Sequence, residues 1–462
     1  MQWFLEAFST FNTMLNEIVW GPPMLCVFLF IGLMYTVRLK FFQVTRFKQW
    51  SKVTFGSLFK KESVDGKKSG ISSFQAMATA LGAAIGTGNI VGVATAITLG
   101  GPGAVFWMWI AGFLGMMTNF AENILGVLYR TKNEDGQWVG GPMYYIERGM
   151  KKKWLAVMFA AVCAFASLGI GNLAQSNSMA EALSISFNVT PEMSAILISI
   201  LVGIAVFGGI KRIGQITEFI VPFMAIFYTI GCIVLLILNY KNLPMALSSM
   251  MKGAFNFNAA AGGAAGYTFA RAVKFGVSRG VFSNEAGIGS SPIVHAATED
   301  YNPMKAGMWG IFQVFVDTTV SCTLTAFCIL TADVLSTGKD GLSLSSAAFS
   351  TVFKGYGEIF LSISVLLFGF AAIVGWSYYG EKSLEYLSGE KYILYYKAFY
   401  VFCTGIGCMM NLKLVWEITD TLNGLMAIPN LIALLFLSKK VVEYTKQRLE
   451  VRGDKEEVRD CV

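Results

Sequence analysis

Apolar stretches of about 20 residues recur along almost the whole chain, and this feature constrains the fold more than any other. A helix of that length crosses the hydrocarbon core of a bilayer. Only 14% of the 462 residues are charged, whereas soluble domains carry roughly a quarter, and the mean hydropathy is +0.56. The sequence therefore predicts an all-α integral membrane protein that crosses the bilayer many times.

The apolar stretches and the basic loops between them predict the topology. Positive residues are concentrated in alternate loops, at 38–71, at 130–153 and at Lys211 and Arg212, and the tail after Ser438 is basic again. The positive-inside rule places these segments in the cytoplasm, which requires an odd number of spans and an N-terminus outside. We therefore expect a multi-pass protein of a cell membrane, of the prokaryotic plasma-membrane type, with a cytoplasmic C-terminus. The eleven expected spans are 20–42, 72–99, 104–129, 154–186, 192–210, 213–238, 266–298, 306–332, 357–383, 393–411 and 414–438.

Two of these spans carry matched interruptions at their centres. The first is Gly86-Thr87-Gly88-Asn89, and the second is the segment SNEAGIGSSP at 283–292. Gly, Asn and Pro weaken a helix, and unwound backbone is tolerated at membrane depth only where it is buried in protein or lines a cavity. The alternative is that the glycines only permit close helix packing. Packing explains one Gly-rich helix more easily than a matched pair.

Each interruption opens a block of five spans, and because five is odd, the second block crosses the membrane in the opposite sense. This arrangement predicts inverted repeats at 72–240 and 241–438, after an extra helix and a basic loop in 1–71 and before a tail at 439–462. Inverted repeats led by broken helices are typical of secondary transporters. Broken helices offer amide groups to an anion and carbonyl groups to a cation. An amino-acid zwitterion and a metal ion need both.

Other classes of function fit the sequence less well. A membrane-embedded hydrolase needs a nucleophile with a base, or metal ligands in a pattern such as HExxH, whereas this chain has one His and dispersed carboxylates. A passive channel for small solutes needs a continuous polar lining, and the spans offer discrete polar points. The net charge of +7 follows from membrane orientation, so no nucleic-acid partner is expected. The sequence leaves the oligomeric state open.

Five segments together carry a family resemblance: GTGNIVGVATAI, GGPGAVFWMW, GGPMYYIERG at 140–149, SNEAGIGSSPIVHAA at 283–297 and VGWSYYGEKSLEYL at 374–387. They resemble the alanine or glycine:cation symporter family. The match runs from about residue 70 to residue 430. The resemblance implies a LeuT-type fold with one additional helix before the first repeat, and sodium-coupled import of a small neutral amino acid, alanine or glycine. Some similar proteins favour glutamine.

The first interruption and one carboxamide form the expected centre of the substrate site. Backbone amides at the start of a half-helix hold an anion, which assigns Thr87 and Gly88 to the substrate carboxylate, and the side chain of Asn89 to the substrate or a cation. A carboxamide at mid-membrane is costly unless it faces protein or water. The resemblance implies that Gln175 is the glutamine of the amino-acid pocket. The alternative for Gln175 is an interhelical hydrogen bond.

Residues near the second interruption complete this expectation. Phe282, Asn284 and Gly287 are expected to close over the ligand and to supply carbonyl oxygens to its ammonium group. Trp376 is expected to wall the pocket and to limit the size of the substrate side chain. A tryptophan of the helix core is the alternative for Trp376.

The expected sodium ligands come from both interruptions. The resemblance implies backbone carbonyls of Gly82, Ala84 and Ile85, together with Asn89, Asn284 and the position of Ala372. Similar proteins usually carry hydroxyl residues near Ala371 and Ala372, which are alanines here. Backbone carbonyls, Ser377 or water then substitute, or the ion dependence differs and protons replace sodium.

Four further titratable residues lie within the expected spans. Three roles are candidates for Glu285: attraction of a cation, cycling of a proton, or pairing with a nearby arginine. Asp317 joins a cation site, relays protons or pairs structurally, since intramembrane carboxylates are default functional candidates. Glu122, one turn after Asn119, is interpreted as structural or gating, and His295 as a packing residue.

Overall fold

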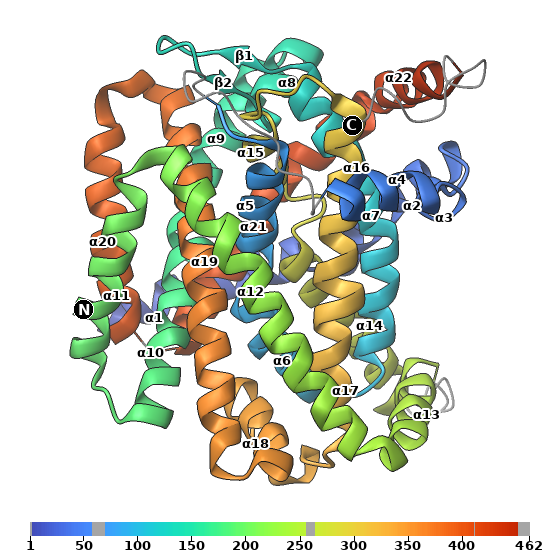
Figure 1. Ribbon diagram of the computed structural model, residues 1–462, viewed down its shortest axis with the longest axis vertical. Helices are drawn as coiled ribbons and strands as arrows, with labels where there is room; N and C mark the ends of the chain where they lie inside the picture. The colour runs from blue at the N-terminus through green and yellow to red at the C-terminus, as the bar shows by residue number, and fades with distance from the viewer. Residues whose placement is uncertain (1, 58–69, 256–263, 411, 451–462) are drawn as a thin grey trace.

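The computed structural model describes residues 2–57, 70–255, 264–410 and 412–450, and helices carry almost all of the secondary structure in these ranges. Figure 1 shows long helices running between two ends of the molecule. One end carries the helix α8 (Pro142–Met150) and a hairpin of two short strands, β1 (Thr131–Lys132) and β2 (Trp138–Val139). We call it the hairpin end. The opposite end carries α13 (Leu243–Ala254) and α18 (Gly341–Phe353), and we call it the α18 end.

The composition of the helices confirms a multi-pass membrane protein. Seven helical segments in the described ranges are long and apolar enough to cross a bilayer. Large apolar side chains such as Ile196, Phe219 and Phe402 are more than half exposed, as expected of residues that face lipid. Most residues in each of the eleven expected ranges are helical. The seven segments are Thr10–Arg38, Ala104–Leu128, Lys153–Phe187, Gly209–Leu238, Pro303–Thr331, Gly355–Met409 and Val415–Phe436.

The first half of the chain begins its helices at local signals. Ser72 forms a capping box with Gln75, in which each side chain bonds to the backbone amide of the other residue. Proline occupies the first turn of several helices, where its missing amide costs nothing. The elements are α1 (Gln2–Val19), α2 (Pro22–Arg38), α3 (Phe42–Thr45), α4 (Phe47–Thr54), η1 (Phe55–Ser57), α5 (Ser73–Ala84), η2 (Thr87–Asn89), α6 (Val91–Gly100), α7 (Ala104–Leu128), α9 (Lys153–Leu168), η3 (Gly169–Leu173), α10 (Ala174–Phe187), α11 (Pro191–Val206), α12 (Gly209–Leu238) and η4 (Tyr240–Asn242).

The second half repeats the pattern of a broken helix followed by long helices. The tail beyond the last expected span continues as a helix that buries Val441 and Val442. The elements are α14 (Ala264–Asn284), α15 (Ser291–His295), α16 (Pro303–Val314), η5 (Phe315–Cys322), α17 (Thr323–Thr331), η6 (Leu335–Thr337), α19 (Gly355–Ser388), η7 (Gly389–Tyr392), α20 (Ile393–Met409), α21 (Leu412–Phe436) and α22 (Ser438–Glu450).

Both predicted interruptions are present. The first helix ends at Ala84, Gly86 is extended with φ −112° and ψ −158°, and α6 begins at Val91. The second helix ends at Asn284, and three of the next five residues have positive φ: Glu285 at 59°, Gly287 at 94° and Gly289 at 88°. Glycine adopts such angles without steric cost, which explains the glycines at 287 and 289.

Two further irregularities were not expected from the sequence. The segments η3 and η5 are π-helical turns inserted between α-helices. Such turns are rare and occur frequently at functional sites. The first precedes Gln175, and the second carries Asp317.

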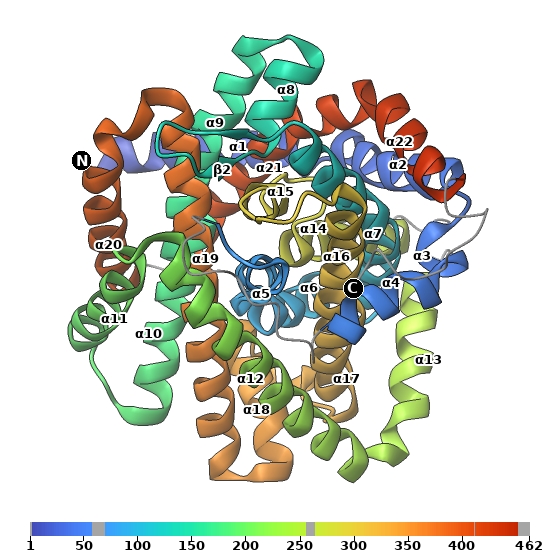
Figure 2. The same cartoon turned by 45° about the horizontal axis from the view of Figure 1, so that its top comes forward.

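The two interruptions lie in the middle of the molecule. Residues 81–90 and 281–290 are all buried. Figure 2 shows α5, α6, α14 and α15 surrounded by α7, α16, α19 and α21. The core therefore encloses the two stretches of non-helical backbone.

Close packing against the second broken helix generates a stability prediction. A Cβ atom at Gly126 of α7 would lie 2.6 Å from the Cβ of Pro292 and 2.9 Å from its carbonyl oxygen. Gly126→Ala is therefore expected to lower the free energy of unfolding by about 1–3 kcal/mol, measured as a lower melting midpoint in detergent. Gly203→Ala in α11 is the control, because its nearest neighbours are 3.7 Å away. Equal midpoints for the two variants would contradict the packing argument.

Candidate functional site

The two interruptions meet at the carboxylate of Asp317. Asn89 donates from Nδ2 to Asp317 Oδ1 at 2.7 Å, and Ser283 Oγ lies 3.0 Å from both carboxylate oxygens. Thr318 donates to Oδ2 at 2.9 Å. Asn89 belongs to the first interruption and Ser283 is the first residue of the segment 283–292, so Asp317 joins the two. All of these partners are uncharged.

Two side-chain oxygens of the first interruption have no hydrogen-bond partner among the described residues. They are Thr87 Oγ1 and Asn89 Oδ1, and both residues are fully buried. Buried polar atoms in native proteins are nearly always paired, so unpaired ones call for an explanation such as a bound ion or ligand. Carboxamide and hydroxyl oxygens are suitable ligands for hard cations.

The end of α5 also leaves backbone oxygens without their helical partners. The amide of Gly86 bonds to the carbonyl of Ala84 at 2.8 Å, and the amide of Thr87 bonds to a side chain. In a continuous helix these two amides would bond to the carbonyls of Gly82 and Ala83. The carbonyl oxygens of Gly82, Ala84 and Ile85, which are the expected sodium ligands, therefore lie at the end of a helix. The carbonyl oxygen of Ala83 lies there too.

Gln175 closes the first interruption from α10. Its Oε1 accepts from the amide of Thr87 at 2.9 Å, and its Nε2 donates to the carbonyl of Ile170 at 3.0 Å. Gly86 has no room for a side chain, because a Cβ there would lie 2.9 Å from Gln175 Oε1. The interaction is interhelical, and it places Gln175 against the first interruption.

The alanines of α19 face the same interruption. A Cβ at Gly86 would lie 3.2 Å from the Cβ of Ala372, and one at Gly82 would lie 3.4 Å from the Cβ of Ala371. Neither alanine supplies a side-chain oxygen there. The hydroxyl of Ser377 donates to the carbonyl of Val374 at 2.6 Å, within its own helix.

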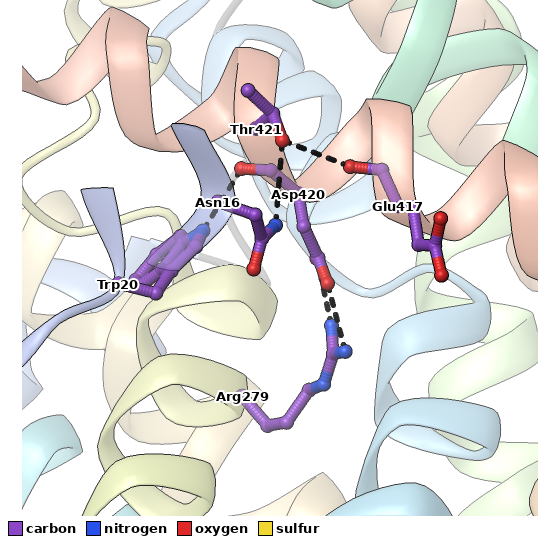
Figure 3. A network of polar contacts seen from close by, with 6 residues as sticks. All are labelled: Asn16, Trp20, Arg279, Glu417, Asp420 and Thr421. Atoms are coloured by element: carbon purple, nitrogen blue, oxygen red, sulfur yellow. Dashed lines mark hydrogen bonds and ion pairs between the residues drawn. The ribbon is translucent and has the colours of Figure 1, made fainter. Parts of the chain in front are cut away.

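Aromatic rings and an ion pair cover one side of the interruption. The ring of Phe282 lies 3.3 Å from the Cβ position of Gly88 and packs on Trp416, with ring centroids 5.2 Å apart. Arg279 lies 5.5 Å from both rings and holds the carboxylate of Asp420 through two bonds of 2.8 Å (Figure 3). We call these four residues the Arg279 barrier. A cavity of about 220 Å³ lies against it, lined by α1, α14 and α21.

A different set of bonds, the Glu285 barrier, connects the second interruption to α19. Trp376 donates from Nε1 to Glu285 Oε1 at 2.8 Å, and Ser290 Oγ donates to Oε2. The indole packs on Gly171 of η3, where a Cβ would meet Trp376 Cβ at 2.2 Å. The expected pairing of Glu285 with an arginine is wrong for the described ranges, because the serine hydroxyl and the indole are its partners. The Glu285 barrier consists of Glu285, Trp376, Ser290 and Gly171.

Asn284 and Gly287 are engaged away from the first interruption. Asn284 donates to Thr318 Oγ1 at 3.0 Å and accepts from the amide of Ala286 at 3.0 Å, so it lies beside the Asp317 cluster. Gly287 donates its amide to Glu122 at 3.1 Å and accepts from the Asn430 side chain at 2.9 Å. The structure therefore brings Asn284 near the site and turns the polar groups of Gly287 toward α7 and α21.

Glu122 holds the second interruption in place, and its partner Asn430 was missed from the sequence. Asn430 donates to Glu122 at 2.5 Å and accepts from the hydroxyl of Tyr145. The signal for Asn430 is a carboxamide within the apolar run of α21. His295 is 1% exposed, and the hydroxyl of Thr298 donates to its carbonyl oxygen, which fits a packing role.

The sequence profile of the sodium:alanine symporter family matches residues 5–460 of this chain. The chain belongs to the sodium:alanine symporter family. Among its relatives, the sodium/alanine symporter AgcS of Methanococcus maripaludis is 43% identical over 456 residues, which cover 97% of this chain and 98% of that protein. The probable sodium/glutamine symporter GlnT of Bacillus subtilis is 38% identical over 439 residues, which cover 94% and 90%.

A solved structure supports the same architecture. The crystal structure of MhsT in complex with L-phenylalanine superposes with a TM-score of 0.57 at 12% identity, covering 83% of this chain and 99% of that one. This likeness concerns the fold, which is LeuT-like, with inverted repeats led by broken helices. The family resemblance seen in the sequence is confirmed. The sodium:alanine symporter family consists of transporters, so the chain is a secondary active transporter with sodium as coupling ion, and not an enzyme.

The geometry at Gly86 generates a prediction for the site. Gly86→Ala places a methyl group against Gln175 Oε1 and Ala372, so it is expected to displace the interruption and to reduce substrate uptake about tenfold or more. Gly92→Ala in α6 is the matched control, because a Cβ there meets nothing within 4 Å. Uptake is measured in vesicles with equal amounts of inserted protein. Unchanged uptake by Gly86→Ala would remove this contact from the site.

Proposed function

We propose that the protein imports a small neutral amino acid, alanine or glycine, together with sodium by alternating access. The observation that carries the proposal is the buried carboxylate of Asp317, which joins the two interruptions through uncharged partners only. A buried charge is costly unless an opposite charge or a proton compensates it. A sodium ion that arrives with the substrate provides that compensation.

We assign the coupling ion to the Asp317 cluster. Asn89 Oδ1 and Thr87 Oγ1 supply unpaired oxygens at the first interruption, and the carboxylate of Asp317 supplies the charge. Side-chain oxygen is lacking at Ala371 and Ala372, so an ion at those residues would depend on backbone carbonyls or water. Sodium at Asp317 therefore accounts for coupling without the hydroxyl residues usual in similar proteins.

The amino acid is assigned to the space between Gln175 and the second interruption. The amides of Thr87 and Gly88 lie just before the N-terminus of α6, where backbone amides can bind a carboxylate. Phe282 covers this region on one side, and Trp376 lies beyond it on another. Two large rings limit the size of the substrate side chain, which favours alanine or glycine.

The proposed topology assigns the two barriers to the two sides of the membrane. With the N-terminus outside and the C-terminus cytoplasmic, the hairpin end faces the cytoplasm, and the Arg279 barrier controls access from outside. The Glu285 barrier and the bonds of Gly287 to Glu122 and Asn430 then control release to the cytoplasm. A site between two barriers is the arrangement of a carrier, whereas a passive channel keeps one continuous path open.

The printed names of relatives favour a second candidate within the same class. One is a probable sodium/glutamine symporter, and another, from Bacillus subtilis and 36% identical, is a putative sodium/proton-dependent alanine carrier. Glutamine as substrate, and protons in addition to sodium as coupling ions, are therefore the alternatives that transport measurements separate.

The first experiment is uptake into proteoliposomes. Labelled alanine is expected to accumulate under an inward sodium gradient and to equilibrate without accumulation when sodium is equal on both sides. Unlabelled alanine, glycine, serine and glutamine then compete in separate samples, and the strongest competitor identifies the substrate. If no small neutral amino acid accumulates under a sodium or a proton gradient, the proposal fails. Non-saturable flux would indicate a channel.

The second experiment isolates the charge of Asp317. Asp317→Asn keeps the shape and removes the charge, so the apparent affinity for sodium is expected to fall about tenfold or more. Asp333→Asn is the control, because Asp333 is exposed. Sodium dependence of uptake is measured for both variants and the wild type. Wild-type sodium dependence in Asp317→Asn would place the coupling ion elsewhere.

A further inference from the structure

Helix α1 is attached to α21 at the turn that carries Asp420 (Figure 3). The indole N–H of Trp20 donates to the backbone carbonyl of Asp420 at 2.9 Å. At the next residue, Thr421 Oγ1 accepts from Asn16 Nδ2 at 3.4 Å, and it also lies 3.4 Å from the carbonyl oxygen of Asn12. Polar groups of α1 and Trp20 thus hold two consecutive residues of α21.

The packing around these bonds is close. A Cβ at Gly424 of α21 would lie 2.7 Å from the Cβ of Val19 and 3.3 Å from Trp20 Nε1. Trp20 is 3% exposed, and its ring stacks on Phe28 of α2 with centroids 5.8 Å apart and planes within 4°. The indole is therefore fixed on both sides, and it holds the carbonyl of Asp420 at a defined position.

The same turn of α21 carries one half of the Arg279 barrier. Both carboxylate oxygens of Asp420 bond to the guanidinium of Arg279 at 2.8 Å. A bidentate pair depends on geometry, because a small displacement of one partner weakens both bonds. The cavity against the pair is lined by Asn16, Glu17 and Trp20. In Figures 1 and 2, α1 crosses the far side of the molecule from the N-terminus toward α2.

We propose that Trp20 and Asn16 are positioning residues of the Arg279 barrier. They hold the backbone of Asp420 where its carboxylate meets Arg279, and α1 has to follow α21 or release it whenever this barrier opens. Helix α1 lies outside the two five-helix blocks, so a segment outside the repeats sets the stability of one closed state. This proposal rests on the proposed function only in that the barrier controls access to the site.

The proposal differs from simple anchoring of the N-terminal helix. If α1 were only anchored, loss of one hydrogen bond would lower the melting midpoint and leave access past Asp420 unchanged. If Trp20 positions Asp420, the same loss shifts the barrier toward its open state. One hydrogen bond of ordinary strength corresponds to a shift of about twofold to tenfold in such an equilibrium.

The experiment measures access directly. Thr87→Cys places a thiol at the first interruption, behind Phe282 and Arg279. The background is Cys26→Ser with Cys461→Ser, because Cys26 is exposed and Cys461 lies beyond the described residues. Sealed vesicles are treated with a membrane-impermeant thiol reagent from each side in turn, without sodium or amino acid. Trp20→Phe keeps a ring for stacking on Phe28 and removes the indole N–H. It is expected to raise the labelling rate about twofold to tenfold from the side of the Arg279 barrier only.

Two further variants separate positioning from stability. Trp154→Phe is the matched control, since Trp154 is 67% exposed on α9, and it is expected to label like the parent. Asp420→Asn removes the charge of the pair and is expected to raise labelling by itself. Adding Trp20→Phe to Asp420→Asn should then change the rate little, because the tryptophan acts through Asp420.

Two outcomes would overturn the proposal: an unchanged labelling rate in Trp20→Phe, or the same fold increase with and without Asp420→Asn. Asn16→Ala, at the edge of the contact, provides a second variant if Trp20→Phe does not insert, and a smaller increase in the same direction is expected. Failure of the proposed function would appear instead as absence of amino-acid accumulation by the unmodified protein. The labelling result does not depend on that measurement.

Discussion

The buried carboxylate of Asp317 connects the two broken helices, and the arrangement of the site depends on this connection. Asp317 lies on a π-helical turn at the centre of the molecule, and its hydrogen-bond partners in the described ranges are carboxamide and hydroxyl groups. Neutral donors orient a carboxylate but do not compensate its charge at low dielectric. Because the donors come from both interruptions, the arrangement of the two broken helices is linked to whatever cation or proton compensates Asp317. The same linkage is the physical requirement for coupled transport.

Side chains of other helices replace the hydrogen bonds that the broken helices lack. Gln175 accepts from the amide of Thr87, and Glu122 accepts from the amide of Gly287. Unwound backbone at membrane depth is stable only with such partners. A structural and a functional interpretation of Gln175 are therefore compatible. Its carboxamide binds the amide of Thr87, which the proposed function assigns to the substrate carboxylate.

Local composition was sufficient to predict the interruptions, and long-range contacts were not predictable. Gly86–Asn89 and the second glycine-rich segment disfavour helix by their own chemistry, whatever surrounds them. The partner of Glu285 is an indole 91 residues away, and Asn430 reaches Glu122 across 308 residues. The π-helical turns η3 (GIGNL) and η5 (FVDTTVSC) also contain residues of low helix propensity, but composition alone does not distinguish an inserted turn from an ordinary helix. The role of α1 at Asp420 depends on how two helices from opposite ends of the chain pack.

The two barriers differ in what opening requires. The pair of Arg279 and Asp420 borders a cavity, and its side chains are 13% and 14% exposed, so water already reaches the groups that would separate. On the other side, Glu285 and Glu122 are 2% and 0% exposed, and their bonds to Trp376, Ser290 and Gly287 would have to break in a dry interior. Leaving a buried carboxylate without partners costs far more than separating a hydrated pair. Opening at the Glu285 barrier therefore needs free energy from ligands that bind the state open at that barrier more tightly. In the proposed transport cycle, the protein without ligands accordingly opens at the Arg279 barrier, and the loaded protein can open at the Glu285 barrier.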